Sequence, residues 1–281
     1  MGATQVVLVT GASTGIGRET VRVLAKRGFR VFATARREES VHELKLEGRE
    51  FGYEAIALDV ENDASVDAAI EHITREAGGV DVLVNNAGFG LLAPVEAITP
   101  EDLRAQFETN VIGAHRLVRA VLPSMRARGR GTIVQLSSVM GRVSMPLYGA
   151  YSASKFALEA LSDALRLEVA PFGIRVVIVE PGPIRTEFSA TVHKRSDSVT
   201  QSERAAPYEG IIKRTQEARA RSRKMSGLGP DAVAATILRA IESPSPATRY
   251  PITPLAHVVP TLRNALPDKV FDRILRMTMA K

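Results

Sequence analysis

The chain has 281 residues, of which 45% are hydrophobic and 24% charged, a composition that suits a folded domain with a large core and argues against disorder. It contains no cysteine, which excludes disulfides and thiolate metal sites, and its histidines at 42, 72, 115, 193 and 257 lack paired spacing, so we expect no metal site. The net charge of +6 is concentrated between Arg185 and Lys224, where ten basic and five acidic residues lie with few aromatic residues among them, so we do not expect nucleic-acid binding.

A strand predicted at residues 5–9 leaves no room for a signal peptide, and no apolar run reaches membrane-spanning length, so we expect a cytoplasmic protein. The strand leads into a glycine-rich turn and a helix predicted at 18–27. Glycines let the backbone approach a pyrophosphate, and a helix N-terminus presents oriented N–H groups to it. The pattern favours a dinucleotide-phosphate site over a turn without a ligand, and the predicted site comprises Gly11, Ser13, Thr14, Gly15, Ile16 and Gly17.

The second predicted strand, at 30–35, ends in Arg36 and Arg37. In a dinucleotide fold this strand end lies beside the adenosine ribose, where a carboxylate favours NAD and an arginine accommodates the 2′-phosphate of NADP. Because no acid precedes Arg36 in the strand, the sequence favours NADP(H). The alternative is a solvated basic pair at the start of the next helix.

Strands and helices alternate, with a helix predicted from 38 to about 46, a strand at 54–58, a helix from 62 or 63 to 76, and a strand at 80–84. The strands are rich in Val, Ile and Leu, which is typical of a parallel sheet covered on both faces. We therefore expect an α/β protein with a Rossmann-type, doubly wound sheet of about seven strands. Asp59 and Val60 follow the third strand and Asn86, Ala87 and Gly88 the fourth, at the edge where such sheets bind ligands.

A helix predicted to start at Pro100 contains Asn110 and Gly113, and both residue types cost stability inside a helix relative to alanine. Such a local conflict often marks a functional position. The alternative is a kink where another element packs closely.

A buried strand predicted at 132–137 delivers Ser138, and Tyr151 and Lys155 follow on a helix that reaches about residue 170. Their i, i+4 spacing places the phenol and the ammonium on one face. We expect the ammonium to lower the phenol pKa from about 10, so that Tyr151 exchanges a proton with a substrate oxygen while Ser138 donates a hydrogen bond to it. The alternative is an ordinary pair on a helix surface.

The rest of the chain adds a strand at 174–179, a turn from Pro181 to Thr186, a polar and basic insert at 187–225, a helix at 230–241 and a strand at 248–252. Residues 253–281 hold two amphipathic helical patterns with a break at Pro267. We see no internal repeat and no linker. We therefore predict one dinucleotide-binding domain over 1–252, with 187–225 as a lid, and a helical extension of that domain over 253–281.

These motifs, in this order, resemble the standard subfamily of the short-chain dehydrogenase/reductase family. The resemblance implies a catalytic tetrad of Asn110, Ser138, Tyr151 and Lys155. Tyr151 would be the proton donor in reduction and the base in oxidation, and Ser138 would polarise the carbonyl. Lys155 would lower the pKa of Tyr151 and bind the nicotinamide ribose, and Asn110 would hold a water that links Lys155 to solvent. Besides the glycine-rich turn and the arginine pair, the resemblance implies NADP(H) contacts at Asp59, Val60, Asn86, Ala87, Gly88, Tyr151, Lys155, Pro181, Gly182, Ile184 and Thr186.

The strand end at Arg36 and the segment Arg249–Pro251 resemble the branch that contains hydroxysteroid and retinol dehydrogenases. This branch implies a small lipophilic carbonyl or alcohol substrate. We also expect a homodimer or homotetramer, since the apolar face of the helix that carries Tyr151 could pack on a second subunit. An apolar pocket suits such a substrate. The predicted pocket residues, which could instead pack the lid, are Phe89, Leu91, Leu92, Val139, Met140, Met145, Leu147 and Phe188.

Three alternatives remain open. The chain could be a reductase of acyl groups on an acidic carrier protein, with the basic segment 185–224 as its docking surface. It could also be a catalytically idle NADP-binding regulatory protein, against which the complete tetrad argues. The amphipathic stripe of residues 253–281 permits peripheral membrane association, although packing over the mouth of the site is the favoured role for it.

Overall fold

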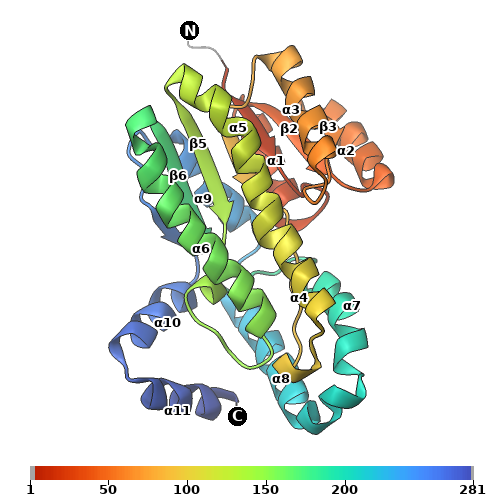
Figure 1. The fold of residues 1–281 in the computed structure, drawn as a ribbon, viewed down its shortest axis with the longest axis vertical. Coiled ribbons are helices and arrows are strands. Elements are labelled where there is room, and N and C mark those ends of the chain that lie inside the picture. The colour runs from red at the N-terminus through yellow and green to blue at the C-terminus, as the bar shows by residue number, and fades with distance from the viewer. Residues whose placement is uncertain (1–3, 280–281) are drawn as a thin grey trace.

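The computed structural model describes residues 4–279, apart from the side chains of 189–191, 193–195, 222–226 and 278–279. At its centre lies a seven-stranded sheet in the order β3-β2-β1-β4-β5-β6-β7, in which all neighbouring strands are parallel (Figure 1). The predicted fold class is therefore confirmed. The strands are β1 (Val6–Val9), β2 (Arg30–Ala35), β3 (Glu54–Ala57), β4 (Val82–Asn85), β5 (Gly131–Leu136), β6 (Ile174–Glu180) and β7 (Arg249–Pro251).

Helices cover both faces of the sheet, and alternate residues of each strand face the two layers. Val7 and Val9 of β1 pack in the layer that holds α1, α2 and α9, whereas Val6 and Leu8 pack in the layer that holds α3, α5 and α6. This alternation explains why the strands are continuous apolar runs. The helices of these layers are α1 (Gly15–Lys26), α2 (Glu38–Phe51), α9 (Pro230–Glu242), α3 (Asp63–Ala77), α5 (Ala114–Arg128) and α6 (Gly149–Val169).

Helix α2 is longer than predicted, because it continues through Gly48 to Phe51 instead of ending near residue 46. Gly48 is buried, and a Cβ there would meet the backbone oxygen of Tyr53 well inside van der Waals distance. The glycine thus allows a close crossing between α2 and the start of β3, and it does not end the helix.

A π-helical turn, η2 (Glu108–Gly113), separates α4 (Pro100–Phe107) from α5 at the predicted conflict. A Cβ at Gly113 would lie 2.8 Å from Cγ2 of Val60, so the glycine permits close packing against the loop after β3. Such single π-turns are frequent at functional sites. The close packing at Gly113 supports the interpretation as a packed kink, and the buried side chain of Asn110 supports the interpretation as a functional position.

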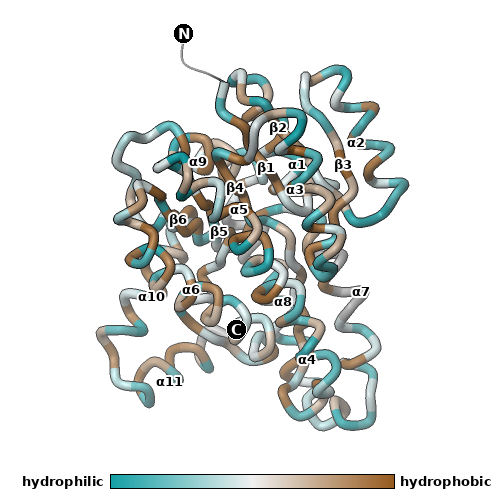
Figure 2. Tube along the Cα trace, turned by 45° about the horizontal axis from the view of Figure 1, so that its top comes forward, coloured by the Kyte–Doolittle hydropathy of each residue, from teal (hydrophilic) through white to brown (hydrophobic). Residues whose placement is uncertain are grey.

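The insert at 187–225 is helical, with α7 (Phe188–Thr200), η5 (Glu203–Tyr208) and α8 (Glu209–Ser226). Residues 253–281 form α10 (Pro254–Ala265) and α11 (Asp268–Met279), which confirms two helices broken at Pro267. Both pairs of helices project beyond the end of the sheet to which the strands point (Figure 1). Hydrophilic and hydrophobic residues alternate along α10 and α11 (Figure 2). Short 3₁₀ turns complete the fold, at η1 (Val95–Ala97), η3 (Val139–Gly141) and η4 (Ala170–Phe172).

Within residues 4–279, no helix combines the length and the apolar character needed to cross a membrane. The same part of the chain contains no cluster of three or more acidic or histidine side chains that could hold a metal ion. The side chain of His193 lies outside the described residues.

Candidate active site

Hydrogen bonds join the carboxyl ends of β1 and β4, and they connect two predicted site motifs, the glycine-rich turn and the segment after β4. The hydroxyl of Thr10 accepts hydrogen bonds from the backbone N–H groups of Asn86 and Ala87, each 3.0 Å long. The Asn86 amide in turn donates to the backbone oxygens of Thr10 (2.8 Å) and Gly11 (3.0 Å). The sheet order changes direction at β1, which is where open α/β sheets bind their ligands.

The glycine-rich turn between β1 and α1 has the features that a dinucleotide phosphate requires. Gly11 and Gly15 have φ of +65° and +57°, a left-handed conformation that favours glycine. A Cβ at Gly11 would lie 2.8 Å from Cα of Ala87, so the turn and the β4 end fit together only with glycine. The N-terminus of α1 has no side-chain cap at Thr14 and no acidic residue in its first turn. Its oriented N–H groups therefore suit an anion.

Across the turn from Gly15 lies Thr186, with its Cβ 3.6 Å from where a Cβ at Gly15 would stand. The segment after β6 thus reaches over the glycine-rich turn, as the prediction of a shared cofactor site requires. The predicted residues Ser13, Ile16 and Gly17 belong to the same turn and first helical residues. Ile184 is buried in the layer of α1 and α9, so it supports this segment from beneath.

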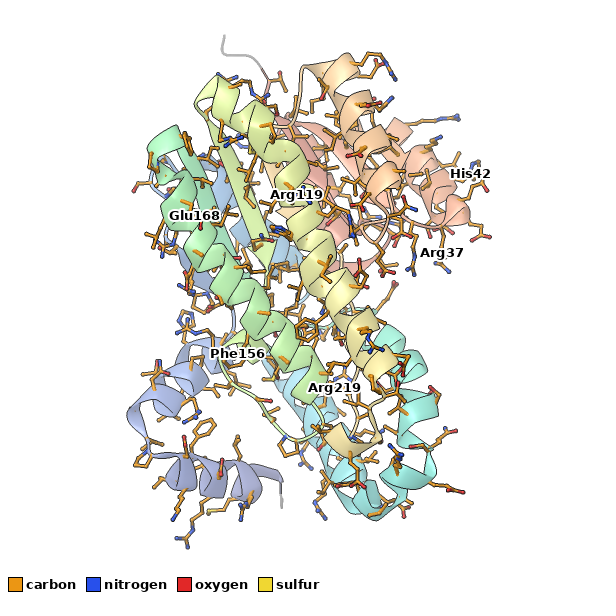
Figure 3. The ribbon with its side chains drawn as sticks, in the orientation of Figure 1. Arg37, His42, Arg119, Phe156, Glu168 and Arg219 are labelled. Carbon is orange, nitrogen blue, oxygen red and sulfur yellow. The ribbon has the colours of Figure 1, made fainter. Side chains whose placement is uncertain are left out.

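The adenosine end of the predicted site carries both arginines. The guanidinium of Arg36 is half exposed and lies 3.8 Å from a carboxylate oxygen of Glu61. Arg37 precedes α2 and donates to the hydroxyl of Ser40 at 3.3 Å (Figure 3). Asp59 accepts the backbone N–H of Glu61 at 3.0 Å. The loop that holds Asp59 therefore also holds the carboxylate that engages Arg36, a neighbour that the sequence did not single out.

Three of the predicted tetrad residues converge at the ends of β5 and α6. The hydroxyl of Ser138 donates to the backbone oxygen of Pro181 at 3.4 Å, and it lies close enough to the buried phenol of Tyr151 to act on the pKa of that phenol. The ammonium of Lys155 is buried and donates to the backbone oxygen of Leu136 at 2.7 Å. It lies 5.9 Å from the centroid of the Tyr151 ring. The phenol and the serine hydroxyl are thus neighbours, as proton exchange and carbonyl binding require.

Burial governs the acid–base properties of this group. It raises the pKa of Tyr151 to about 12, although the neighbouring Ser138 hydroxyl and the charge of Arg219 on α8 act in the opposite direction. The net direction is opposite to the predicted lowering, because the burial of the phenol outweighs the neighbouring groups that favour its charged form. Burial also lowers the pKa of Lys155 to about 8, against the charge of Glu159. At neutral pH the phenol therefore keeps its proton.

Asn110 braces the site from the π-turn. Its amide oxygen accepts the backbone N–H of Phe89 at 3.0 Å. Its amide nitrogen donates to the backbone oxygen of Phe89 (2.9 Å) and to the hydroxyl of Ser154 (3.0 Å), which itself donates to the backbone oxygen of Tyr151. A Cβ at Gly88 would lie 3.0 Å from Oδ1 of Asn110 and 3.9 Å from the Lys155 ammonium. Asn110 thus links the loop after β4 to α6, the helix that carries Tyr151 and Lys155. Its role in holding a water stays a prediction.

The predicted nicotinamide-side motif also anchors the C-terminal extension. Gly182 lies so close to Thr253 that a Cβ there would overlap its hydroxyl. That hydroxyl caps α10 by accepting the backbone N–H of Ala256 at 3.2 Å. Pro181, on the other side, accepts hydrogen bonds from Ser138 and from the backbone of Val139. One short segment therefore connects Ser138 to the start of the extension.

The predicted pocket residues belong to two apolar clusters, apart from Leu147, which belongs to neither. Tyr151 packs in one apolar cluster with Ala256 and Phe271 of the extension, and its ring centroid lies 5.8 Å from that of Phe188. Five predicted pocket residues belong to this cluster, and they are Leu92, Val139, Met140, Met145 and Phe188. Phe89 and Leu91 belong instead to a cluster with the insert, and Leu147 is buried in a left-handed turn with φ of +69°.

Sequence reasoning missed an ionic network beside Lys155, the predicted catalytic lysine. Glu159, one turn after Lys155, is buried and receives a hydrogen bond from Arg249 at 3.1 Å. Arg249 also contacts Asp163 at 2.6 Å and Glu180 at 3.2 Å. Burial raises the pKa of Glu159 to about 7. The i, i+4 spacing from the lysine to an acid on a helix with small buried residues was the available signal.

Known proteins are similar in sequence to this chain over nearly its whole length. A family model described as short chain dehydrogenase matches residues 5–197. The chain is 40% identical over 271 residues to the uncharacterized oxidoreductase YbbO of Escherichia coli K12, covering 96% of this chain and 93% of that protein. It is 35% identical over 278 residues to 3-ketodihydrosphingosine reductase of Bacteroides thetaiotaomicron, covering 98% of both. It is 35% identical over 280 residues to human 17-beta-hydroxysteroid dehydrogenase type 1, covering 95% of this chain and 82% of that protein.

Solved structures are similar over nearly the whole chain. A short-chain dehydrogenase from Streptomyces avermitilis is 34% identical, with a TM-score of 0.76 and 99% of both chains covered. A variant of actinorhodin polyketide ketoreductase, solved with NADPH, is 31% identical, with a TM-score of 0.76, covering 92% of this chain and all of that one.

Proposed function

The chain belongs to the short-chain dehydrogenase/reductase family, in the hydroxysteroid and retinol dehydrogenase-like branch, and from this premise we propose that it is an NADP(H)-dependent oxidoreductase of a lipophilic carbonyl compound and its alcohol. The observation that carries this proposal is the phenol of Tyr151, which is buried in an apolar cluster with the hydroxyl of Ser138 as its neighbour. A proton donor and a carbonyl-binding group thus stand side by side where an apolar substrate would fit.

The cofactor half of the site would hold NADP(H) through the glycine-rich turn, the α1 N-terminus and Arg36. The left-handed glycines and the uncapped helix support the phosphate contacts, and the exposed guanidinium at the β2 end supports the contact with a 2′-phosphate. The bound cofactor supplies or accepts a hydride at its nicotinamide. Thr186, beside Gly15, would close over the bound cofactor.

The protein supplies the proton. Because burial raises the pKa of Tyr151 to about 12, the phenol is protonated at neutral pH and can donate to the oxygen of a carbonyl as that oxygen gains charge. The Ser138 hydroxyl would shift its donation from Pro181 to the same oxygen. Lys155 holds a positive charge beneath the phenol at neutral pH and stabilises the tyrosinate that remains. In the oxidation of an alcohol these proton movements run in reverse.

The apolar cluster around Tyr151 supports a lipophilic substrate. Its other members are mainly leucine, valine, methionine and phenylalanine side chains. The names of two relatives, 3-ketodihydrosphingosine reductase and 17-beta-hydroxysteroid dehydrogenase type 1, both indicate lipophilic compounds. We therefore place ketones with a long-chain or polycyclic skeleton first among candidate substrates.

Two finer expectations join this proposal. We expect a cytoplasmic homodimer or homotetramer, and the exposed side chains of Phe156 and Leu161 on α6 support self-association; Figure 3 shows Phe156 on this helix. A reductase of carrier-linked acyl groups is the second candidate, because the segment from Arg185 to Lys224 carries ten basic and five acidic residues.

A substrate panel tests the proposal. Purified protein is incubated with NADPH or NADH and with a steroid ketone, a long-chain 3-keto amine, an aromatic ketone or a carrier-linked 3-ketoacyl group, and absorbance loss of the reduced cofactor is followed. We expect turnover with NADPH and the lipophilic ketones. Turnover only with the carrier-linked substrate would favour the second candidate, and a lack of turnover in both directions across the panel would contradict the proposal.

A further inference from the structure

The two helices of the C-terminal extension each carry a second apolar stripe that faces away from the site. On α10, Ala256 and Pro260 are buried, whereas Leu255, Val258 and Leu262 are exposed. The spacing of the exposed residues, i, i+3 and i+7, aligns them along one side of the helix. α10 therefore packs with one face and leaves a continuous apolar face uncovered.

Helix α11 repeats the arrangement. Phe271 is buried in the cluster that contains Tyr151, while Val270, Ile274 and Met277 are exposed by 44%, 36% and 61%. These three residues are again spaced i, i+4 and i+7 and form a stripe beside the buried one. The helix thus packs on the apolar cluster around Tyr151 with one side and presents apolar side chains to the surroundings on the other.

A basic stripe borders the exposed apolar stripe of α11. Lys269, Arg273 and Arg276 are all exposed and precede the apolar residues by one position each, which places them about 100° around the helix. The acidic residues of α11, Asp268 and Asp272, lie about 180° from the apolar stripe. Lysine and arginine next to an exposed apolar face, with the acids turned away, is the pattern of a helix that lies in a membrane interface.

We infer that α10 and α11 dock on the surface of an anionic lipid bilayer, with their exposed apolar stripes in the headgroup region and Lys269, Arg273 and Arg276 on the lipid phosphates and carboxylates. The ion pair from Arg263 to Asp268, at 2.6 Å, joins the two helices across their break, so they can present one surface. The docking does not depend on the activity. Its use for delivering substrate does rest on the proposed function, because Phe271 of α11 lines the cluster around Tyr151 and a lipophilic ketone could pass from the bilayer beside it.

A second copy of the chain is a poorer partner for this surface. A two-fold contact pairs a surface with itself, so the basic stripe of one copy would approach that of the other. The acids of α11 point away and cannot neutralise the charges. Anionic lipid supplies the opposite charge directly, at a gain of about fivefold in binding for each basic residue near the surface.

The test is co-sedimentation of the full-length protein with phosphatidylcholine vesicles that either contain or lack phosphatidylserine, without substrate or cofactor. We expect binding only to the anionic vesicles, weakened by salt. The double variant Arg273→Gln/Arg276→Gln should bind about 25-fold more weakly, by the same fivefold factor for each charge. Ile274→Gln/Met277→Gln should also lose binding, whereas the matched control Leu46→Gln/Leu167→Gln, at exposed leucines of α2 and α6, should bind as the wild type does.

Several results would overturn the inference. These are no sedimentation with anionic vesicles, equal binding to neutral vesicles, or the same loss of binding in the control. A shift of the wild type to a larger species in size-exclusion chromatography, lost in Ile274→Gln/Met277→Gln without any vesicle binding, would identify a second copy as the occupant. Turnover of a short, water-soluble ketone without vesicles is measured separately, so failure of the docking and failure of the proposed function can be told apart.

Discussion

Arg36 is expected to select the cofactor, and replacing it with Asp should reverse the choice. In the structure its guanidinium is half exposed and 3.8 Å from Glu61, a surface ion pair that contributes about 0–1 kcal/mol. A hydrogen bond to a charged 2′-phosphate contributes about 1.5–3 kcal/mol. Engaging the phosphate and releasing Glu61 therefore leaves about 0.5–3 kcal/mol in favour of NADP(H), which corresponds to about 2–140-fold in relative affinity.

The assay is kcat/KM with NADPH and with NADH for the wild type and for Arg36→Asp, at one fixed ketone concentration. The wild type should prefer NADPH, and Arg36→Asp should prefer NADH, because the carboxylate repels the 2′-phosphate and accepts a hydrogen bond from a free 2′-hydroxyl. Glu61→Gln should strengthen the NADPH preference, since the guanidinium is then released. Lys45→Asp makes a similar change of charge on the exposed side of α2 and should leave the ratio unchanged.

A wild type that prefers NADH would refute the reasoning. So would an Arg36→Asp variant with an unchanged ratio, or a ratio that moves equally in Lys45→Asp. In each of these cases the arginine would be only a solvated residue at the end of β2.

Three further predictions follow from the site. Lys155→Met should lose both turnover and NADPH affinity. Ketone reduction by the wild type should decline as pH rises through about 8, because burial lowers the pKa of Lys155 to about 8 and its positive charge is lost above that pH. A pH–rate profile that stays flat to about pH 9.5 would be inconsistent with this prediction. Gly182→Ala should lower the free energy of unfolding by about 1–3 kcal/mol, seen as a lower thermal midpoint, because the new Cβ overlaps Thr253 and the α10 cap is lost. Adding Thr253→Ala to this variant should recover part of the lost stability. Limited proteolysis should cut first within 187–225 and more slowly with NADPH, so a first cut elsewhere that ignores the cofactor would count against a lid.

The sheet was predictable because its strands bury both faces and are therefore continuous apolar runs. The motifs at the strand ends were also predictable, because a left-handed turn at Gly11 and a tight fit between Gly11 and Ala87 leave little freedom in residue type. The helix boundary at Phe51 was missed because α2 continues through Gly48, a residue type that costs stability inside a helix, and the close crossing that requires glycine there is not visible in the sequence. The helices of the insert were missed because their polar, charged sequence carries little periodicity.

The electrostatics of the site were less accessible than its residues. The spacing placed Tyr151 near Lys155 correctly, but the direction of the phenol pKa depends on how completely the ring is buried. That burial is not local in sequence. The partner of Glu159 is Arg249, 90 positions away, and it becomes a neighbour only when β7 joins the edge of the sheet. Long-range partners of this kind set the charge of the site, and they follow from the fold.

The central claim, that Tyr151 donates the proton in a cofactor-dependent carbonyl reduction, is tested most directly by Tyr151→Phe. The measurement is the single-turnover rate of NADPH oxidation with the best ketone of the panel, alongside NADPH binding followed by cofactor fluorescence. We predict a rate lower by about 10²–10⁴-fold with NADPH binding largely retained, because the ring still packs against Phe188 while the general acid is gone. A Tyr151→Phe variant that reduces the ketone at close to the wild-type rate would contradict the account.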